Sequence, residues 1–113
     1  MPDWSVKIVP AAQPTTAAPA AFQPDLIGSR PGDPLKVQDG DLVTWNNTTN
    51  DTHWPWRVSD GSNAPGQLCD PVPGNASSRP SFAVNLPKGG TISYCCKYHP
   101  QETGSIVVVP VGS

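Results

Sequence analysis

A short stretch near the C-terminus carries the residues best suited to chemistry. In "YCCKYHPQETG", residues 94–104, Cys96 is followed three positions later by His99. The chain has one other histidine, His53, far upstream. A Cys-x-x-His spacing suggests a metal-binding loop, and one thiolate with two imidazoles is a soft donor set that suits copper or zinc. The sequence therefore predicts a metal site, provided that the fold brings His53 to this loop.

The elements that must position these residues are short strands. Fifteen prolines and ten glycines in 113 residues argue against long helices. Apolar and β-branched runs between turn signals predict strands instead, at 4–9, 35–37, 41–45, 56–59, 81–86, 91–96 and 104–109. This pattern favours an all-β fold, a Greek-key β-sandwich of about 7–8 strands in a single domain, 1–113. Because the loops at one end of a sandwich cluster, His53 and His99 can meet there.

Two connections are long for so small a domain. The segment 10–33 is rich in proline and alanine. It is either a flexible linker or an extended segment lying along the sandwich, with Phe22, Leu26 and Ile27 as its anchors; we favour the second. The connection 63–80 has a length typical of loops that are functional or held down by contacts.

Charge and hydropathy exclude several function classes. The net charge is −2, with acids and bases scattered along the chain. This leaves no basic surface for nucleic acid and no polybasic patch for a membrane. No stretch approaches the roughly 20 apolar residues of a membrane span. The start, "MPDWSVKIVP", lacks the features of a signal peptide. We therefore expect either a cytosolic protein or a mature exported domain.

Two motifs together resemble the cupredoxins, the blue-copper family. "GDLVTWNNTTNDTH", ending at His53, resembles the first ligand region of that family. "YCCKYHPQETGSIVV" resembles its C-terminal ligand loop, with the amicyanin- or plastocyanin-like spacing of two residues between Cys96 and His99. The resemblance covers roughly 34–110.

The resemblance implies a ligand set and a function. His53, Cys96 and His99 would surround one mononuclear copper ion that carries single electrons between redox partners, without enzymatic activity. The partner proteins would dock near His99 and Trp54. The resemblance also implies a periplasmic or secreted monomer.

The chain departs from the family first at the axial ligand. Cupredoxins usually place methionine three residues after the second histidine, where this chain has Glu102. Glu102 is the first axial candidate, Gln101 the second and a backbone carbonyl the third. A carboxylate favours Cu(II), lowers the potential and shifts the colour from blue toward green or red. In the alternative reading, Glu102 points into water, as most glutamates do.

Two further departures lie beside the ligands. Trp54 replaces the asparagine that commonly follows the first histidine, and it begins a "WPW" run that forms a dry cover, a docking face or ordinary core. Adjacent side chains of a strand face opposite ways, so Cys95 faces away from the site if Cys96 faces it. Cys69 is its only available partner. A Cys69–Cys95 disulfide closing about 25 residues would contribute ~3 kcal/mol and indicate an oxidising compartment. The alternative is three free cysteines.

Other functions stay open at the level of sequence. The added carboxylate is compatible with copper storage, sensing or delivery, and an open axial position is compatible with a small catalytic copper site. Zinc is a less favoured metal, because affinity at nitrogen and sulfur sites is highest for copper. In the reading without a metal, both histidines are surface residues and Cys96 is a buried core thiol.

Overall fold

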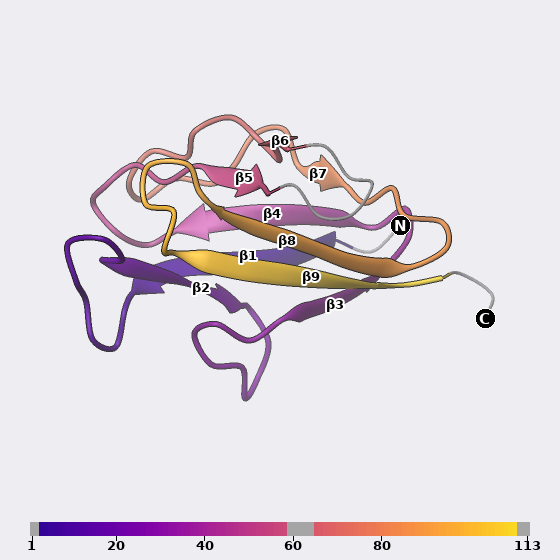
Figure 1. The fold of residues 1–113 in the computed structure, drawn as a ribbon, viewed down its shortest axis with the longest axis horizontal. Helices are drawn as coiled ribbons and strands as arrows, with labels where there is room; N and C mark the ends of the chain where they lie inside the picture. Colours follow the sequence, from indigo (N-terminus) through magenta and orange to yellow (C-terminus); the bar gives the residue numbers. More distant parts are fainter. Residues whose placement is uncertain (1–2, 59–64, 111–113) are drawn as a thin grey trace.

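The computed structural model describes residues 3–58 and 65–110, which form two β-sheets (Figure 1). The first sheet has the order β2-β1-β4-β7 and the second the order β3-β9-β8-β5-β6. The strands are β1 (Asp3–Pro10), β2 (Ala20–Pro24), β3 (Leu35–Gln38), β4 (Leu42–Asn47), β5 (Pro55–Arg57), β6 (Gly66–Gln67), β7 (Phe82–Ala83), β8 (Gly90–Cys96) and β9 (Thr103–Val109). The predicted all-β sandwich is confirmed. None of the described residues forms a helix long and apolar enough to cross a membrane.

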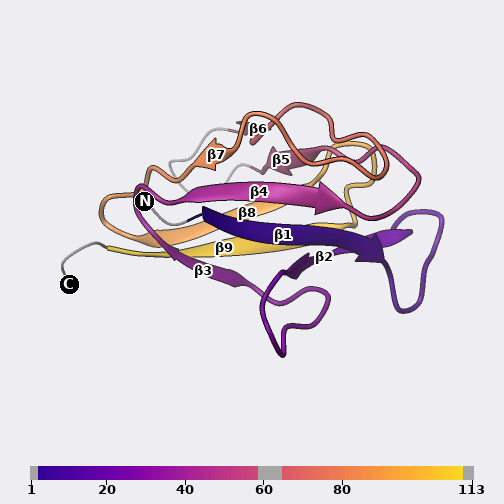
Figure 2. The ribbon, with the colours of Figure 1, turned by 180° about the vertical axis from the view of Figure 1, so that it is seen from behind.

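Strand direction brings several loops to one end of the sandwich. β1 runs parallel to β4, and β8 runs antiparallel to β9. The loops after β1, after β4 and between β8 and β9 therefore lie together, at the left in Figure 1. Figure 2 shows from behind how β1 lies between β2 and β4. This end contains both histidines.

The alternating strands form where the sequence predicted them. Val6 and Ile8 on β1 and Ile106 and Val108 on β9 are buried, with less buried residues between them. A period of two is what a strand with one buried face requires. The predicted strand 81–86 is shorter than expected, since only Phe82–Ala83 pair with β4. The last residue of the predicted strand 56–59 lies outside the described residues.

The proline- and alanine-rich segment contributes a strand that the sequence pattern did not predict. β2 pairs antiparallel with β1 and forms the edge of its sheet. Phe22 anchors it, since this side chain is buried in the core. The expected anchoring by Leu26 and Ile27 is wrong, because both are exposed in the turn after β2.

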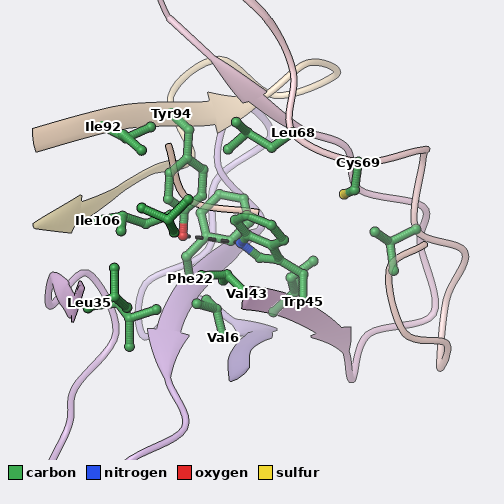
Figure 3. Packing of buried hydrophobic residues seen from close by; sticks show 14 of the residues in the cluster. Val6, Phe22, Leu35, Val43, Trp45, Leu68, Cys69, Ile92, Tyr94 and Ile106 are labelled. Atoms are coloured by element: carbon green, nitrogen blue, oxygen red, sulfur yellow. Dashed lines mark hydrogen bonds between the residues drawn. The ribbon is translucent and has the colours of Figure 1, made fainter. Parts of the chain in front are cut away.

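Three aromatic side chains meet within a largely aliphatic core between the sheets (Figure 3). Trp45 on β4 and Phe22 on β2 each meet the ring of Tyr94 on β8 edge to face, at 5.4 and 4.9 Å between centroids. The buried Trp45 indole N–H donates to the Tyr94 hydroxyl at 3.2 Å. Gly104 lies opposite Tyr94 on β9, and a Cβ there would come within 2.5 Å of the ring. Glycine at this position thus leaves room for the tyrosine.

Tyr94→Phe is expected to lower the free energy of unfolding of the metal-free protein by about 1–3 kcal/mol, because it leaves the buried Trp45 N–H without an acceptor. Urea unfolding followed by tryptophan fluorescence measures the change. Tyr98→Phe is the matched control, since Tyr98 is 51% exposed, and should change stability by less than ~0.5 kcal/mol. Equal losses in the two variants would contradict a special role for the Trp45–Tyr94 hydrogen bond.

Candidate metal centre

His53 is held at the sandwich end by the long connection before β7. Its backbone N–H donates to Val72 O at 3.1 Å, and Val72 N donates to His53 O at 2.8 Å. The Asn47 side chain at the end of β4 donates to Val72 O at 3.1 Å and to Asp51 O at 2.6 Å. The His53 side chain is 1% exposed. These contacts fix the imidazole in the interior, which excludes the reading of His53 as a surface histidine.

The loop between β8 and β9 is closed by its own backbone. His99 N donates to Cys96 O at 3.1 Å, and Glu102 N donates to His99 O at 2.9 Å. Cys96 N then donates to Glu102 O at 3.0 Å, so the two ends of the loop are paired. This compact turn directs the side chains of Cys96, His99 and Glu102 to the same place. Gln101, the second axial candidate, is exposed.

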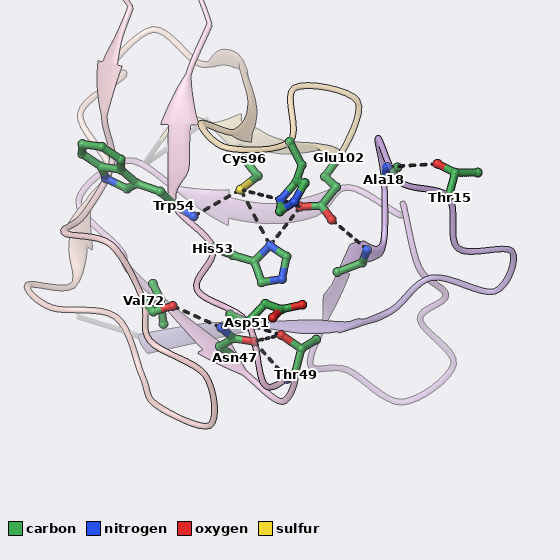
Figure 4. Close-up of polar contacts among 12 residues, drawn as sticks. Thr15, Ala18, Asn47, Thr49, Asp51, His53, Trp54, Val72, Cys96 and Glu102 are labelled. Carbon is green, nitrogen blue, oxygen red and sulfur yellow. Dashed lines mark hydrogen bonds and ion pairs between the residues drawn. The ribbon is translucent and has the colours of Figure 1, made fainter.

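The structure brings four predicted residues together (Figure 4). The ligand atoms of His53, Cys96, His99 and Glu102 all lie within 4.8 Å of one another. Cys96 Sγ is 3.7 Å from both His53 Nδ1 and His99 Nδ1. Glu102 Oε1 lies 3.0 Å from His53 Nδ1 and 3.5 Å from His99 Nδ1. Glu102 is 2% exposed, so the reading in which it points into water is wrong.

Backbone groups complete the surroundings of the cysteine sulfur. The Trp54 amide donates to Cys96 Sγ at 3.3 Å, which stabilises negative charge on the sulfur. The Trp54 indole N–H points elsewhere, to Cys69 O at 2.7 Å. Neither contact was predictable from residue types, because each has a backbone group as one partner: the Trp54 amide as a donor and Cys69 O as an acceptor.

Known structures with the same architecture were found by comparison. An oxidised variant of amicyanin is 28% identical over 66% of this chain and 68% of its own, with a TM-score of 0.52. A reduced Cu(I) variant of amicyanin is 23% identical over 93% and 80% of the two chains, with a TM-score of 0.59. A purple cupredoxin from Nitrosopumilus maritimus is 16% identical over 93% and 98%, with a TM-score of 0.63. The chain has the cupredoxin fold. No protein-family model matches the chain, and no curated protein matches it in sequence.

In the metal-free site, the electrostatics favour a Cys96 thiolate beside a protonated His53. Burial alone would lower the pKa of His53, but hydrogen bonds with Cys96 and Glu102 outweigh it and raise the pKa to about 9. Burial also acts to raise the pKa of Cys96. Contacts with His53, the Trp54 amide and His99 outweigh that effect and lower the pKa of the thiol. A thiolate is the form of cysteine that binds metals, and metal binding displaces the proton on its partner.

The predicted Cys69–Cys95 disulfide is wrong, since all three cysteines are free thiols. Cys69 lies in the core between the sheets and is 2% exposed. Cys95 is on the opposite face of β8 from Tyr94 and Cys96, where it lines a surface cavity with Val58 and Thr103. The two sulfurs therefore face different sides of one sheet. Burial raises the pKa of the Cys69 thiol to about 12, which keeps it protonated.

Titration of the denatured, unreduced, metal-free protein with a thiol reagent is expected to count three thiols. Cys95→Ser should change the free energy of unfolding by much less than the ~3 kcal/mol expected on losing a disulfide of this loop length. A count of one thiol would show that the Cys69–Cys95 disulfide does form. In that case Cys95→Ser should lower stability, and reductant should lower the stability of the unsubstituted protein by the same amount.

Proposed function

We propose that this cupredoxin-fold protein binds one copper ion through His53, Cys96 and His99, with Glu102 as the axial fourth ligand. The observation that carries the proposal is the buried cluster of four donors within 4.8 Å. Copper is preferred to zinc because the set combines a thiolate with two imidazoles, and affinity at such sites is highest for copper. Bound there, copper would supply a one-electron redox couple.

The protein's role is then one-electron transfer between redox partners, without catalysis. Three of the donors are almost fully buried, whereas the His99 side chain is 25% exposed. A site closed on most sides and open at one imidazole edge suits transfer of electrons without access of substrate. Glu102 Oε1 lies among the other donors, 3.0 Å from His53 Nδ1 and 3.5 Å from His99 Nδ1. There it would fill the remaining position on the metal, which disfavours an open catalytic site.

An aromatic face beside His99 supports a docking surface for such partners. The Trp54 ring lies 5.0 Å from the Trp56 ring and 5.9 Å from the Tyr98 ring, between centroids. The Lys97 ammonium lies over Trp56 at 4.3 Å from the centroid. Aromatic residues are enriched at the core of protein interfaces, and the rim around them is polar. We propose that monomers of this protein meet their partners here, in the periplasm or outside the cell.

Titration of the metal-free protein with Cu(II), followed by visible absorption and EPR, tests the proposal. We expect an intense sulfur-to-copper charge-transfer band that saturates at one equivalent. Zn(II) added first should compete for the same site and suppress the band. No band in a folded protein would exclude a cysteinate–copper site, and the electron-transfer role with it.

Copper storage or delivery is the second candidate, and Glu102 is the observation that favours it. A buried carboxylate stabilises Cu(II) and lowers the potential, which makes redox cycling harder. The electron self-exchange rate, measured by NMR on mixtures of Cu(I) and Cu(II) protein, separates the two roles. Fast exchange supports electron transfer, and slow exchange with a low potential supports storage or delivery.

A further inference from the structure

The two carboxylate oxygens of Glu102 have different partners. Oε1 lies at the metal cluster, 3.0 Å from His53 Nδ1. Oε2 accepts a hydrogen bond of 2.7 Å from the backbone N–H of Ala20. Both residues are buried, at 2% and 4% exposure. The bond joins positions 82 residues apart, so it ties the ligand loop to the first strand pair of the chain.

The fold explains why this amide is available. Pro10 and Ala20 are partners in the β1–β2 pair, and Ala11 N donates to Pro19 O next to them. In that antiparallel pattern the Ala20 N–H points away from β1. β2 is the edge strand of its sheet, so within residues 3–58 and 65–110 no further strand accepts a hydrogen bond from it. β2 contacts β9 of the other sheet, and Glu102 immediately precedes β9.

We propose that the Ala20 amide is a positioning group that reserves one carboxylate oxygen of Glu102, Oε1, for the metal. This inference rests on the proposed copper site. The hydrogen bond fixes the rotation of the carboxylate and draws charge from it, because hydrogen bonds to an ionised acceptor are strong. The strand β2 and the loop 11–19 before it therefore set the strength of the axial ligand. Outer contacts of this kind tune ligands as well as orient them.

The test removes the donor and leaves the carboxylate in place. Ala20→Pro deletes the N–H at the first residue of a strand, where proline is tolerated. Ala18→Pro is the matched control. It deletes an N–H in the same loop that donates only to the exposed Thr15 hydroxyl. We expect Ala20→Pro to weaken Cu(II) binding by about 10- to 100-fold and to shift the charge-transfer band and the EPR hyperfine coupling. Ala18→Pro should match the unsubstituted protein.

The same substitution made in a Glu102→Ala variant tests whether Ala20 acts on the copper site through Glu102 or through the fold. In Glu102→Ala protein the Ala20→Pro substitution should leave the copper spectrum unchanged, because the group through which it acts is gone. If Ala20→Pro shifts the spectrum equally in both backgrounds, the inference is overturned. It is also overturned if Ala20→Pro binds copper with the affinity and spectrum of Ala18→Pro.

A metal-free measurement keeps the inference testable if Ala20→Pro does not fold or if no copper band forms. In the metal-free protein the Ala20 amide should be protected from hydrogen exchange by NMR, and Glu102→Ala should remove most of that protection. Unchanged protection would show that Glu102 does not hold this amide. Lost protection without any copper band in the unsubstituted protein would instead refute the proposed function while preserving the contact.

Discussion

Replacing Cys96 with serine is expected to abolish the charge-transfer absorption on addition of Cu(II) and to weaken copper binding by more than about 100-fold. Loss of a single hydrogen-bond partner of a metal ligand costs about 10- to 100-fold in affinity, and this substitution removes the thiolate itself. Cys96 is fully buried, and its sulfur accepts a hydrogen bond from the backbone amide of Trp54. The oxygen of serine is a poor substitute for that role, because at neutral pH it stays protonated. Absorption and EPR titrations of the metal-free variant measure both effects.

Cys95→Ser provides the matched control for this prediction. The two cysteines are adjacent, yet Cys95 faces the outer side of β8 and is not part of the donor cluster. We expect its variant to keep the band and the affinity of the unsubstituted protein. If both variants lost the band, the substitutions would act on the fold of β8, and unfolding curves of the metal-free proteins would show it. If Cys96→Ser kept the band, Cys96 would not be a ligand.

The regular strands and the donor residues were predictable because each depends on local pattern. β1 and β9 alternate buried and less buried residues, and the fold follows from burying that face. The spacing of Cys96 and His99 is set within one loop. The meeting of that loop with His53 required only that both loops lie at the same end of a sandwich. Glu102 needed the resemblance as well, since a glutamate by itself is most often exposed.

Other features were not predictable because they depend on contacts distant in sequence. β2 consists of two alanines, the buried Phe22, a glutamine and a proline, and is a strand only because β1 is beside it. The alternation of side chains along a strand correctly predicted that Cys95 and Cys96 face opposite sides of the sheet. This alternation does not apply to Cys69, because Cys69 lies in an irregular connection that places it in the core. The amides that donate hydrogen bonds to Cys96 and Glu102 are backbone groups, so residue types do not predict these contacts.

Glu102→Gln is expected to raise the reduction potential of the copper site by on the order of 100 mV. It removes one negative charge near the metal with little change of shape. Two charges about 4 Å apart interact by ~4 kcal/mol at an effective dielectric of about 20, and ~1.4 kcal/mol corresponds to about 59 mV for one electron. Relaxation around the site offsets part of this. The potential rises because the oxidised state carries the extra positive charge. Removal of the carboxylate therefore destabilises Cu(II) more than Cu(I).

The adjacent residue supplies the control, and a second substitution tests the ligand itself. Gln101→Glu adds a charge in an exposed position one residue away, where solvent screens it, and should leave the potential almost unchanged. Glu102→Met replaces the carboxylate by the thioether usual in cupredoxins. It should raise the potential further and move the absorption toward blue. Protein-film voltammetry measures the potentials. Equal potentials in the unsubstituted protein, Glu102→Gln and Glu102→Met would show that Glu102 does not bind the metal, even though its Oε1 lies among the donors.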